Sequence, residues 1–307
     1  MDPTHLHLLL NHVPTIGFGI AVALYALSLW IDSRDLKLAG LVLFVLVAIT
    51  TIPAYVTGNA AQLNLQNENV DVSASLIETH EGAAFLSMAV MEVTGALAWL
   101  ALWTLRRTSR LSAAMGRAIL ALSVVTFGLM ALTAKLGGEI NHPEIRSAQE
   151  PTFIGPFARV VGSYVRDTPW TWIAAETLHF VGLSLLLGVI LLINLRVLGV
   201  ARRLPFAALD RLLPWAMLGF AINTLTGMLF IAASYGQYVS SPPIYWKLLF
   251  VVLAALNTLY FTFDRTWLLG PDREAPVLSK AAAVTAVVLW VGVLYWGSML
   301  PFIGTAF

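Results

Sequence analysis

The sequence predicts an all-α protein, a polytopic membrane bundle of eight transmembrane helices arranged in two four-helix halves. Hydrophobic residues make up 58% of the 307 residues and charged residues only 11%, and the mean hydropathy is +0.79. An average soluble domain carries about 25% charged residues, so a soluble fold could not cover this much apolar surface. The apolar residues also gather in runs of about 20, the length that a helix needs to cross the hydrocarbon layer.

Eight such runs follow one another along the chain. Two of them follow a capping side chain and a proline, at Asp2-Pro3 and at Asp167-Thr168-Pro169, a pattern typical of helix N-termini. The predicted spans are Leu6–Ile31, Leu38–Thr57, Ala83–Leu105, Arg117–Ala134, Trp172–Leu195, Leu212–Ser234, Leu248–Phe263 and Ala281–Leu300. We expect an N-terminal half over residues 1–140, an external segment over 141–170 and a C-terminal half over 171–307.

The basic residues predict the orientation of the bundle. Of the 18 Lys and Arg residues, 13 fall in loops that lie inside if the N-terminus lies outside. Because cytoplasmic loops carry the excess of basic residues, we expect both termini outside, in a multi-pass protein of the bacterial inner membrane. No basic segment precedes the first span, so we expect no cleaved signal peptide.

Two external segments are long enough to carry structure of their own. Gly58–Ile77 is polar, rich in Asn and Gln, and has no Lys or Arg. The segment Gly137–Trp170 has apolar side chains at roughly helical spacing, namely Phe153, Phe157, Val160, Val161 and Tyr164. That spacing predicts a helix, which either lies in the membrane interface or is an ordinary surface helix.

The composition excludes several classes of function. The chain has no cysteine, which excludes disulfides, cysteine zinc sites, iron–sulfur clusters and the covalent attachment of c-type haem. Any haem must therefore be held without covalent links, and any metal must use His, Met, carboxylate or backbone ligands. A formal net charge of +1 gives no reason to expect nucleic-acid binding.

The histidines are the first candidates for a functional site. There are six of them, and all fall in the predicted outer half of the membrane or just outside it: His5, His7, His12, His80, His142 and His179. Imidazole inside a membrane is costly unless it is paired or coordinated. His5 is expected at the surface, whereas His12, His80 and His179 either coordinate a cofactor or form hydrogen bonds between helices.

Acidic residues lie close to these histidines. Glu78 and Glu81 flank His80, and Glu92 lies about 20° from Glu81 on a helical wheel, so the two carboxyl groups share a face. A carboxyl group at the depth of Glu92 either belongs to a proton path or is bonded to a neighbouring helix. We name Glu81 and Glu92 as candidate proton-transferring residues.

The first half resembles a family of uncharacterised bacterial four-helix membrane proteins suspected of binding haem. The resemblance rests on His7-Leu8-Leu9-Leu10-Asn11-His12-Val13-Pro14, which is similar to the H-P-x-x-x-H-F-P opening of that family, on His80, and on Gly137-Gly138-Glu139-Ile140-Asn141-His142. Leu8 and Val13 stand where the family has Pro and Phe. The resemblance covers residues 5–145 and implies a haem-binding bundle.

The second half resembles another uncharacterised family of four-helix, cytochrome b-like proteins. The matching segments are Leu178–Gly182, Asn194–Gly199, Thr226-Gly227 and Tyr245-Trp246-Lys247. That pattern normally supplies a second histidine in a later helix, and the chain has none after His179. His179 therefore either pairs with a histidine of the first half, or this half has no cofactor.

These observations lead to the hypothesis of a membrane b-type cytochrome subunit with one or two haem b groups. We expect axial iron ligation by His12 and His80 or, as a second choice, by His7 and His142. His7 and His12 lie about 140° apart on a helix, so they cannot serve one haem from the same direction.

The arginines and the partners complete this hypothesis. Arg159 and Arg166 are expected to neutralise haem propionates. Electrons would pass between a membrane quinol and an external or periplasmic redox protein, or a larger membrane complex. Two alternatives are a copper-type permease, with Met88, Met91, His80 and Glu92 along one helix, and a cofactor-free membrane anchor for an external partner.

Overall fold

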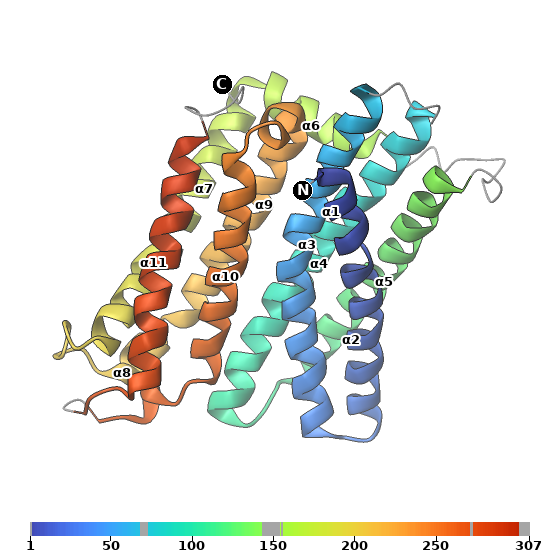
Figure 1. Ribbon diagram of the computed structural model, residues 1–307. Coiled ribbons are helices and arrows are strands. Elements are labelled where there is room, and N and C mark those ends of the chain that lie inside the picture. The colour runs from blue at the N-terminus through green and yellow to red at the C-terminus, as the bar shows by residue number, and fades with distance from the viewer. Residues whose placement is uncertain (1, 68–72, 143–153, 155, 271–272, 301–307) are drawn as a thin grey trace.

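The computed structural model describes residues 2–67, 73–142, 154, 156–270 and 273–300 (Figure 1). Within these ranges the chain forms helices joined by turns and has no strand. Eight helical segments of the described chain are long and apolar enough to cross a membrane. The predicted all-α bundle with eight transmembrane helices is confirmed.

Two of the eight membrane segments are interrupted: the first is broken near its start, and the sixth joins two helices and has a non-helical residue, Ser234, near its end. The elements are α1 (Pro3–Leu10), α2 (His12–Trp30), α3 (Arg34–Asn67), α4 (Ala74–Thr108), α5 (Ala113–Asn141), α6 (Phe157–Asp167), α7 (Pro169–Val197), α8 (Phe206–Asp210), α9 (Leu213–Val239), α10 (Pro243–Phe263), the 3-10 turn η2 (Thr266–Leu268) and α11 (Val277–Met299). Helices α1 and α2 together form the first span, and α8 and α9 the sixth.

The start of the first span follows from its capping residues. The carboxylate of Asp2 accepts a hydrogen bond from the backbone N–H of Thr4 at 3.1 Å, and Pro3 occupies the first turn, as predicted. Pro14 has no N–H to donate to the carbonyl of Leu10, which favours the break between α1 and α2. The break lets α1 pack mainly on α3. The side chain of Thr168 makes no capping bond at the start of α7, so a side-chain cap there was a wrong expectation.

Helices α3 and α4 extend well beyond the predicted spans, to 34 and 35 residues. Residues 58–67 and 74–77, which were expected in a polar external segment, are helical. The extensions carry polar side chains that bond across the two helices, including Gln62 to Glu81 at 3.3 Å. Gln62 is therefore buried in a helix–helix contact and does not lie in a solvated loop.

The first half is a closed four-helix arrangement. Helix α3 packs on α2 and α4, and α5 packs on α4 and α2. In the second half α7 packs on α9 and α11, and α10 packs on α11. The halves meet where α3 and α4 contact α9 and α10, and one hydrophobic core runs through both.

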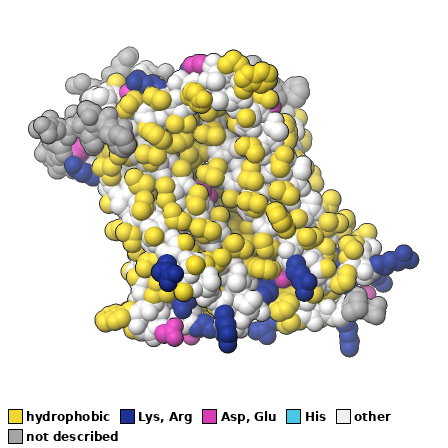
Figure 2. Space-filling view, turned by 180° about the vertical axis from the view of Figure 1, so that it is seen from behind, with side chains coloured by type: hydrophobic (Ala, Val, Ile, Leu, Met, Phe, Trp, Pro, Cys, Tyr) yellow, Lys and Arg dark blue, Asp and Glu magenta, His cyan; other side chains and the backbone are white. Residues whose placement is uncertain are grey.

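The two ends of the bundle differ in their side chains. We call one the histidine end: it holds α1, α6, the last turns of α3 and α5 and the first turns of α4 and α7 (Figure 1). The opposite, arginine end holds Arg34, Arg106, Arg107, Arg196, Arg202 and Arg265. Figure 2 shows hydrophobic side chains over the middle of one face and most of the Lys and Arg below them. Which end faces the cytoplasm stays a prediction.

Helix α6 is the helix expected in the external segment. It buries Ala158, Gly162 and Val165 against α9 and α4. Its other face carries Val160 and Tyr164, which are 56% and 61% exposed, whereas Phe153 lies outside the described residues. The segment with amphipathic spacing is therefore a helix, and it contacts α4 of the first half and α9 of the second.

Candidate functional site

The imidazole of His7, which belongs to α1, packs against the neighbouring helix α3. Its Nδ1 lies 3.0 Å from the carbonyl oxygen of Ala54. One turn further along α3, a Cβ at Gly58 would lie only 2.9 Å from Cε1 of the imidazole. The ring thus spans one turn of α3, with a hydrogen bond at one end and a glycine beneath it.

His80 repeats this arrangement on a different pair of helices. Its Nδ1 lies 3.0 Å from the carbonyl oxygen of Thr133 in α5. A Cβ at Gly137, four residues after Thr133, would lie 3.0 Å from Cε1 of His80. Each imidazole therefore contacts residues n and n+4 of the neighbouring helix, through a carbonyl oxygen and a glycine respectively.

The hydrogen bonds fix the tautomer of both rings. A carbonyl oxygen only accepts, so Nδ1 of His7 and Nδ1 of His80 each carry a hydrogen. In the neutral imidazole Nε2 then has a free lone pair. Neither Nε2 makes a hydrogen bond to a described residue. This is the state in which histidine binds a metal, with the other ring nitrogen held by a backbone carbonyl.

The two imidazoles are neighbours in space although they are 73 residues apart in sequence. Both are half-buried. His7 and His80 come from the first and third spans, which do not pack side by side in the closed first half. The structure thus brings together two histidines from opposite helices of one four-helix bundle.

His12 lies in a less suitable place than His7. It is exposed, and its Nδ1 lies 3.3 Å from the carbonyl oxygen of Leu8 on its own helical segment. We expected His12 to pair with His80; of the two histidines in the first span, it is His7 whose Nδ1 is bonded to the neighbouring helix α3. His5 is exposed beside Asp2, and His142 is exposed at the C-terminal cap of α5.

His179 links two helices of the second half. Its Nδ1 lies 2.8 Å from Oγ1 of Thr226, whose hydroxyl donates to the carbonyl of Ile222. Its ring also packs against Phe230 at 5.5 Å between centroids. Because α7 packs chiefly on α9, α11, α6 and α8, His179 is placed to join α7 to α9.

Glu81 and Glu92 belong to a polar seam between α3 and α4. Glu81 accepts a hydrogen bond from Gln62. Glu92 is 4% exposed. Within the part of the chain that the structure describes, three buried polar atoms of α3 and α4 have no hydrogen-bond partner, namely Tyr55 Oη, Asn59 Oδ1 and Glu92 Oε1. Unpaired buried polar atoms are costly, so the seam is a natural place for water.

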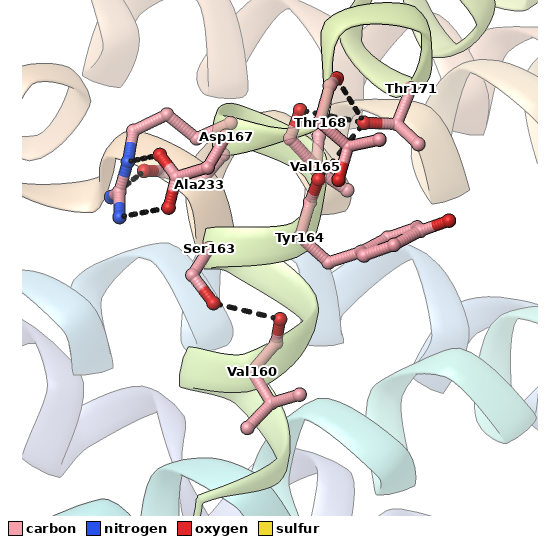
Figure 3. A network of polar contacts seen from close by, with 9 residues as sticks. Val160, Ser163, Tyr164, Val165, Asp167, Thr168, Thr171 and Ala233 are labelled. Atoms are coloured by element: carbon pink, nitrogen blue, oxygen red, sulfur yellow. Dashed lines mark hydrogen bonds and ion pairs between the residues drawn. The ribbon is translucent and has the colours of Figure 1, made fainter.

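Arg159 and Arg166 have protein partners at the histidine end. Arg159 forms an ion pair with Glu78 at 2.6 Å. Arg166 pairs with Asp167 and donates to the carbonyl of Ala233 at 2.9 Å (Figure 3). The hydrogen bond to Asp167 and its charge raise the pKa of Arg166, so the guanidinium stays charged. A propionate would have to compete with these partners.

The methionines named for a copper path are used in packing. Met88 and Met91 are buried in the core, and Sδ of Met91 lies 2.9 Å from the hydroxyl of Thr51. Among the described residues, no three His, Cys, Asp or Glu side chains lie together as a metal cluster. A bis-histidine haem needs only two protein ligands.

Sequence reasoning missed Gly58, and it named Gly137 only as part of a family resemblance, without the contact to His80. Gly58 and Gly137 lie in polar or glycine-rich stretches and carry no functional group, but each allows an imidazole to approach a helix backbone. The pattern that would identify such a contact is a glycine four residues after the residue whose carbonyl binds the histidine. It can be recognised only when it is known which helices pack together.

Comparison with known proteins gives no family for this chain. No family model matches it, and no curated protein or solved structure is significantly similar to it.

Proposed function

We propose that the protein is a membrane b-type cytochrome in which His7 and His80 bind one haem at the histidine end of the first half. The observation that carries the proposal is the repeated arrangement of the two imidazoles, each with Nδ1 bonded to a backbone carbonyl and Nε2 free. Neutral imidazoles with this tautomer are the ligands that haem iron takes.

The donor set suits a haem better than other metals. Two histidines from opposite helices of one bundle can hold an iron whose other four ligands come from a porphyrin. The haem supplies one-electron transfer when bound. His7 and His80 would hold the haem through Nε2, with their rings oriented by the hydrogen bonds of Nδ1 to α3 and α5, and the surrounding apolar helices would limit access of water.

The electron partners follow from where the site lies. Electron transfer weakens with distance, so a haem at the histidine end serves partners at that end. We propose a membrane quinol as the donor and a redox protein, or a larger membrane complex, as the acceptor. Oxidation of one quinol to a quinone would release two electrons, which the acceptor would receive one at a time, and two protons, which the carboxylate of Glu81 would take up one after the other. Glu92, further along α4, would be a second proton-accepting group.

The experiment that tests this function is a reduced-minus-oxidised spectrum of the purified protein, with a haem-to-protein ratio. We expect a b-type spectrum with about one haem per chain. His7→Ala and His80→Ala should each lose most of the haem, whereas His5→Ala and His179→Ala should keep it. A purified, folded protein with no haem absorption would reject the proposal and leave the anchor and the permease, which metal analysis separates.

A further inference from the structure

A cavity of about 600 Å³ lies where the two halves meet at the histidine end. Its walls come from α3 and α4 of the first half and from α6 and α9 of the second. Glu81, which follows His80 in the chain, lies on its wall together with Gln62. Pockets between helices and at domain boundaries are common places for ligands.

The backbone of α9 is broken where it forms the cavity wall. Ser234 has non-helical φ and ψ of −148° and 43° in the middle of this stretch, and residues 232–237 all line the cavity. Irregular backbone within a membrane span is tolerated where it is buried in protein or lines a cavity. The break is therefore consistent with a built binding wall.

Helix α6 holds this broken wall in place. Gly162 lies so close to the carbonyl of Ala232 that any side chain there would clash with it. One turn later, Arg166 donates a hydrogen bond to the carbonyl of Ala233 (Figure 3). On the other side of the cavity Tyr235 donates to the side-chain carbonyl of Gln66 at 3.1 Å, which bridges α9 and α3.

The charged side chains that line the cavity are two glutamates and two arginines. Arg159 is paired with Glu78, and Arg166 with Asp167. Glu81 accepts a hydrogen bond from the neutral side chain of Gln62, and both side chains line the cavity. Carboxyl and amide oxygens can accept hydrogen bonds from a neutral molecule.

The remaining wall combines apolar and polar side chains. Leu65, Ile77, Ala232 and the ring of Tyr235 supply apolar surface, and Gln66, Ser163, Ser234 and Gln237 supply further polar groups. Sites for small molecules combine apolar surface with polar groups that fix orientation. The ligand class that combines a flat apolar body with hydroxyl donors is a dihydroxylated ring.

We propose that this cavity binds the dihydroxylated ring of a quinol, with one ring hydroxyl donating to the carboxylate of Glu81. The choice of a quinol rests on the proposed function, whereas the hydroxyl-donating ring rests on the cavity itself. The same ring chemistry occurs in membrane quinols and in water-soluble hydroquinones, and the competition arm below separates these sources.

The test is photolabelling of the full-length protein in lipid nanodiscs with a ring-azido quinol, kept reduced under anaerobic conditions, followed by mapping of the labelled peptides. We expect labels within residues 60–67, 74–82, 157–170 and 230–240. Ser163→Trp fills the cavity from α6 and should lower labelling about tenfold. Val160→Trp places the same indole on the exposed face of α6 and should leave labelling unchanged. Labels elsewhere, or full labelling of Ser163→Trp, would overturn the proposal.

A second variant covers the case in which Ser163→Trp does not fold. Glu81→Leu removes the acceptor without adding bulk and should weaken competition by an unlabelled short-chain quinol about tenfold. Two competitors of the label separate the sources: the same short-chain quinol, which carries an isoprenoid tail, and hydroquinone, which has none. Competition by the tailed quinol alone identifies a membrane source, and equal competition by hydroquinone identifies a soluble source. If neither competes, the proposal is contradicted. The absorption spectrum of the same sample reports the haem separately. If the cavity is labelled and the protein has no haem, only the proposed cytochrome function is rejected. If the protein has haem and the cavity is not labelled, only the proposed quinol site is rejected.

Discussion

The imidazole of His80 occupies the space that a side chain on Gly137 would need, since a Cβ at Gly137 would lie 3.0 Å from Cε1 of the ring. His7 stands in the same relation to Gly58. In both cases the glycine lies one turn after the carbonyl that holds Nδ1. Orientation of the two candidate ligands therefore depends on the neighbouring helices as much as on the histidines themselves.

Gly137→Leu should displace His80 and lower the haem-to-protein ratio severalfold, because the new side chain takes the position of the ring. Gly128→Leu is the matched control on the same helix. A Cβ at Gly128 would meet nothing within 4 Å, and leucine has the better helix propensity. Haem content measured by pyridine haemochrome should separate the two variants, and equal haem content in both would contradict the role of Gly137.

Glu92→Gln should keep the fold and the haem but slow reduction by quinol severalfold. The substitution preserves the size of a side chain that is 4% exposed and removes its ability to carry a proton. Stopped-flow reduction followed at several pH values is the measurement. An unchanged rate at all pH values would make Glu92 structural, and loss of haem would place it in support of the haem site.

Asp210→Asn should lower the free energy of unfolding by about 3–5 kcal/mol, the cost of leaving one charge of a buried pair without its partner. Arg107 pairs with Asp210, the two side chains are 9% and 11% exposed, and the guanidinium also lies over Trp103 and Trp267. This cluster ties α4 of the first half to α8 of the second.

The exposed pair of Arg202 and Glu274 provides the control for Asp210→Asn. Both side chains of this pair are mostly exposed, and exposed ion pairs contribute little to stability. Glu274→Gln should therefore shift the midpoint of chemical denaturation much less than Asp210→Asn. Similar shifts for the two variants would show that the Arg107 cluster does not join the halves.

The histidine end is predicted to face the outside of the inner membrane, because most Lys and Arg residues lie in the loops at the other end. A reporter that is active only in the cytoplasm, fused after Phe307, should be inactive. The same reporter inserted in the loop before Ala113 should be active. The opposite pattern would reverse the orientation and place the proposed quinol oxidation on the cytoplasmic side.

Much of the fold could be predicted from the sequence because a membrane span needs only length and apolar composition. The extensions of α3 and α4 could not, since Gln62 lies in a stretch whose polar composition predicts an external segment, and its hydrogen bond to Glu81 shows it in a helix–helix contact. Spacing separates His7 from His12 on a helical wheel but does not say which one faces α3. The structure answers this question: α1 is separate from α2 and packs on α3, and His7 is the histidine that contacts Ala54 of α3.

The identity of the two axial ligands is the central claim, and exchange of each histidine for methionine tests it most directly. Methionine also ligates haem iron, and a His/Met pair raises the reduction potential relative to a bis-histidine pair. We predict that His7→Met and His80→Met each keep haem, change its low-spin spectrum and raise its midpoint potential, and that His12→Met matches the wild type. A changed spectrum in His12→Met with an unchanged one in His7→Met would contradict the claim.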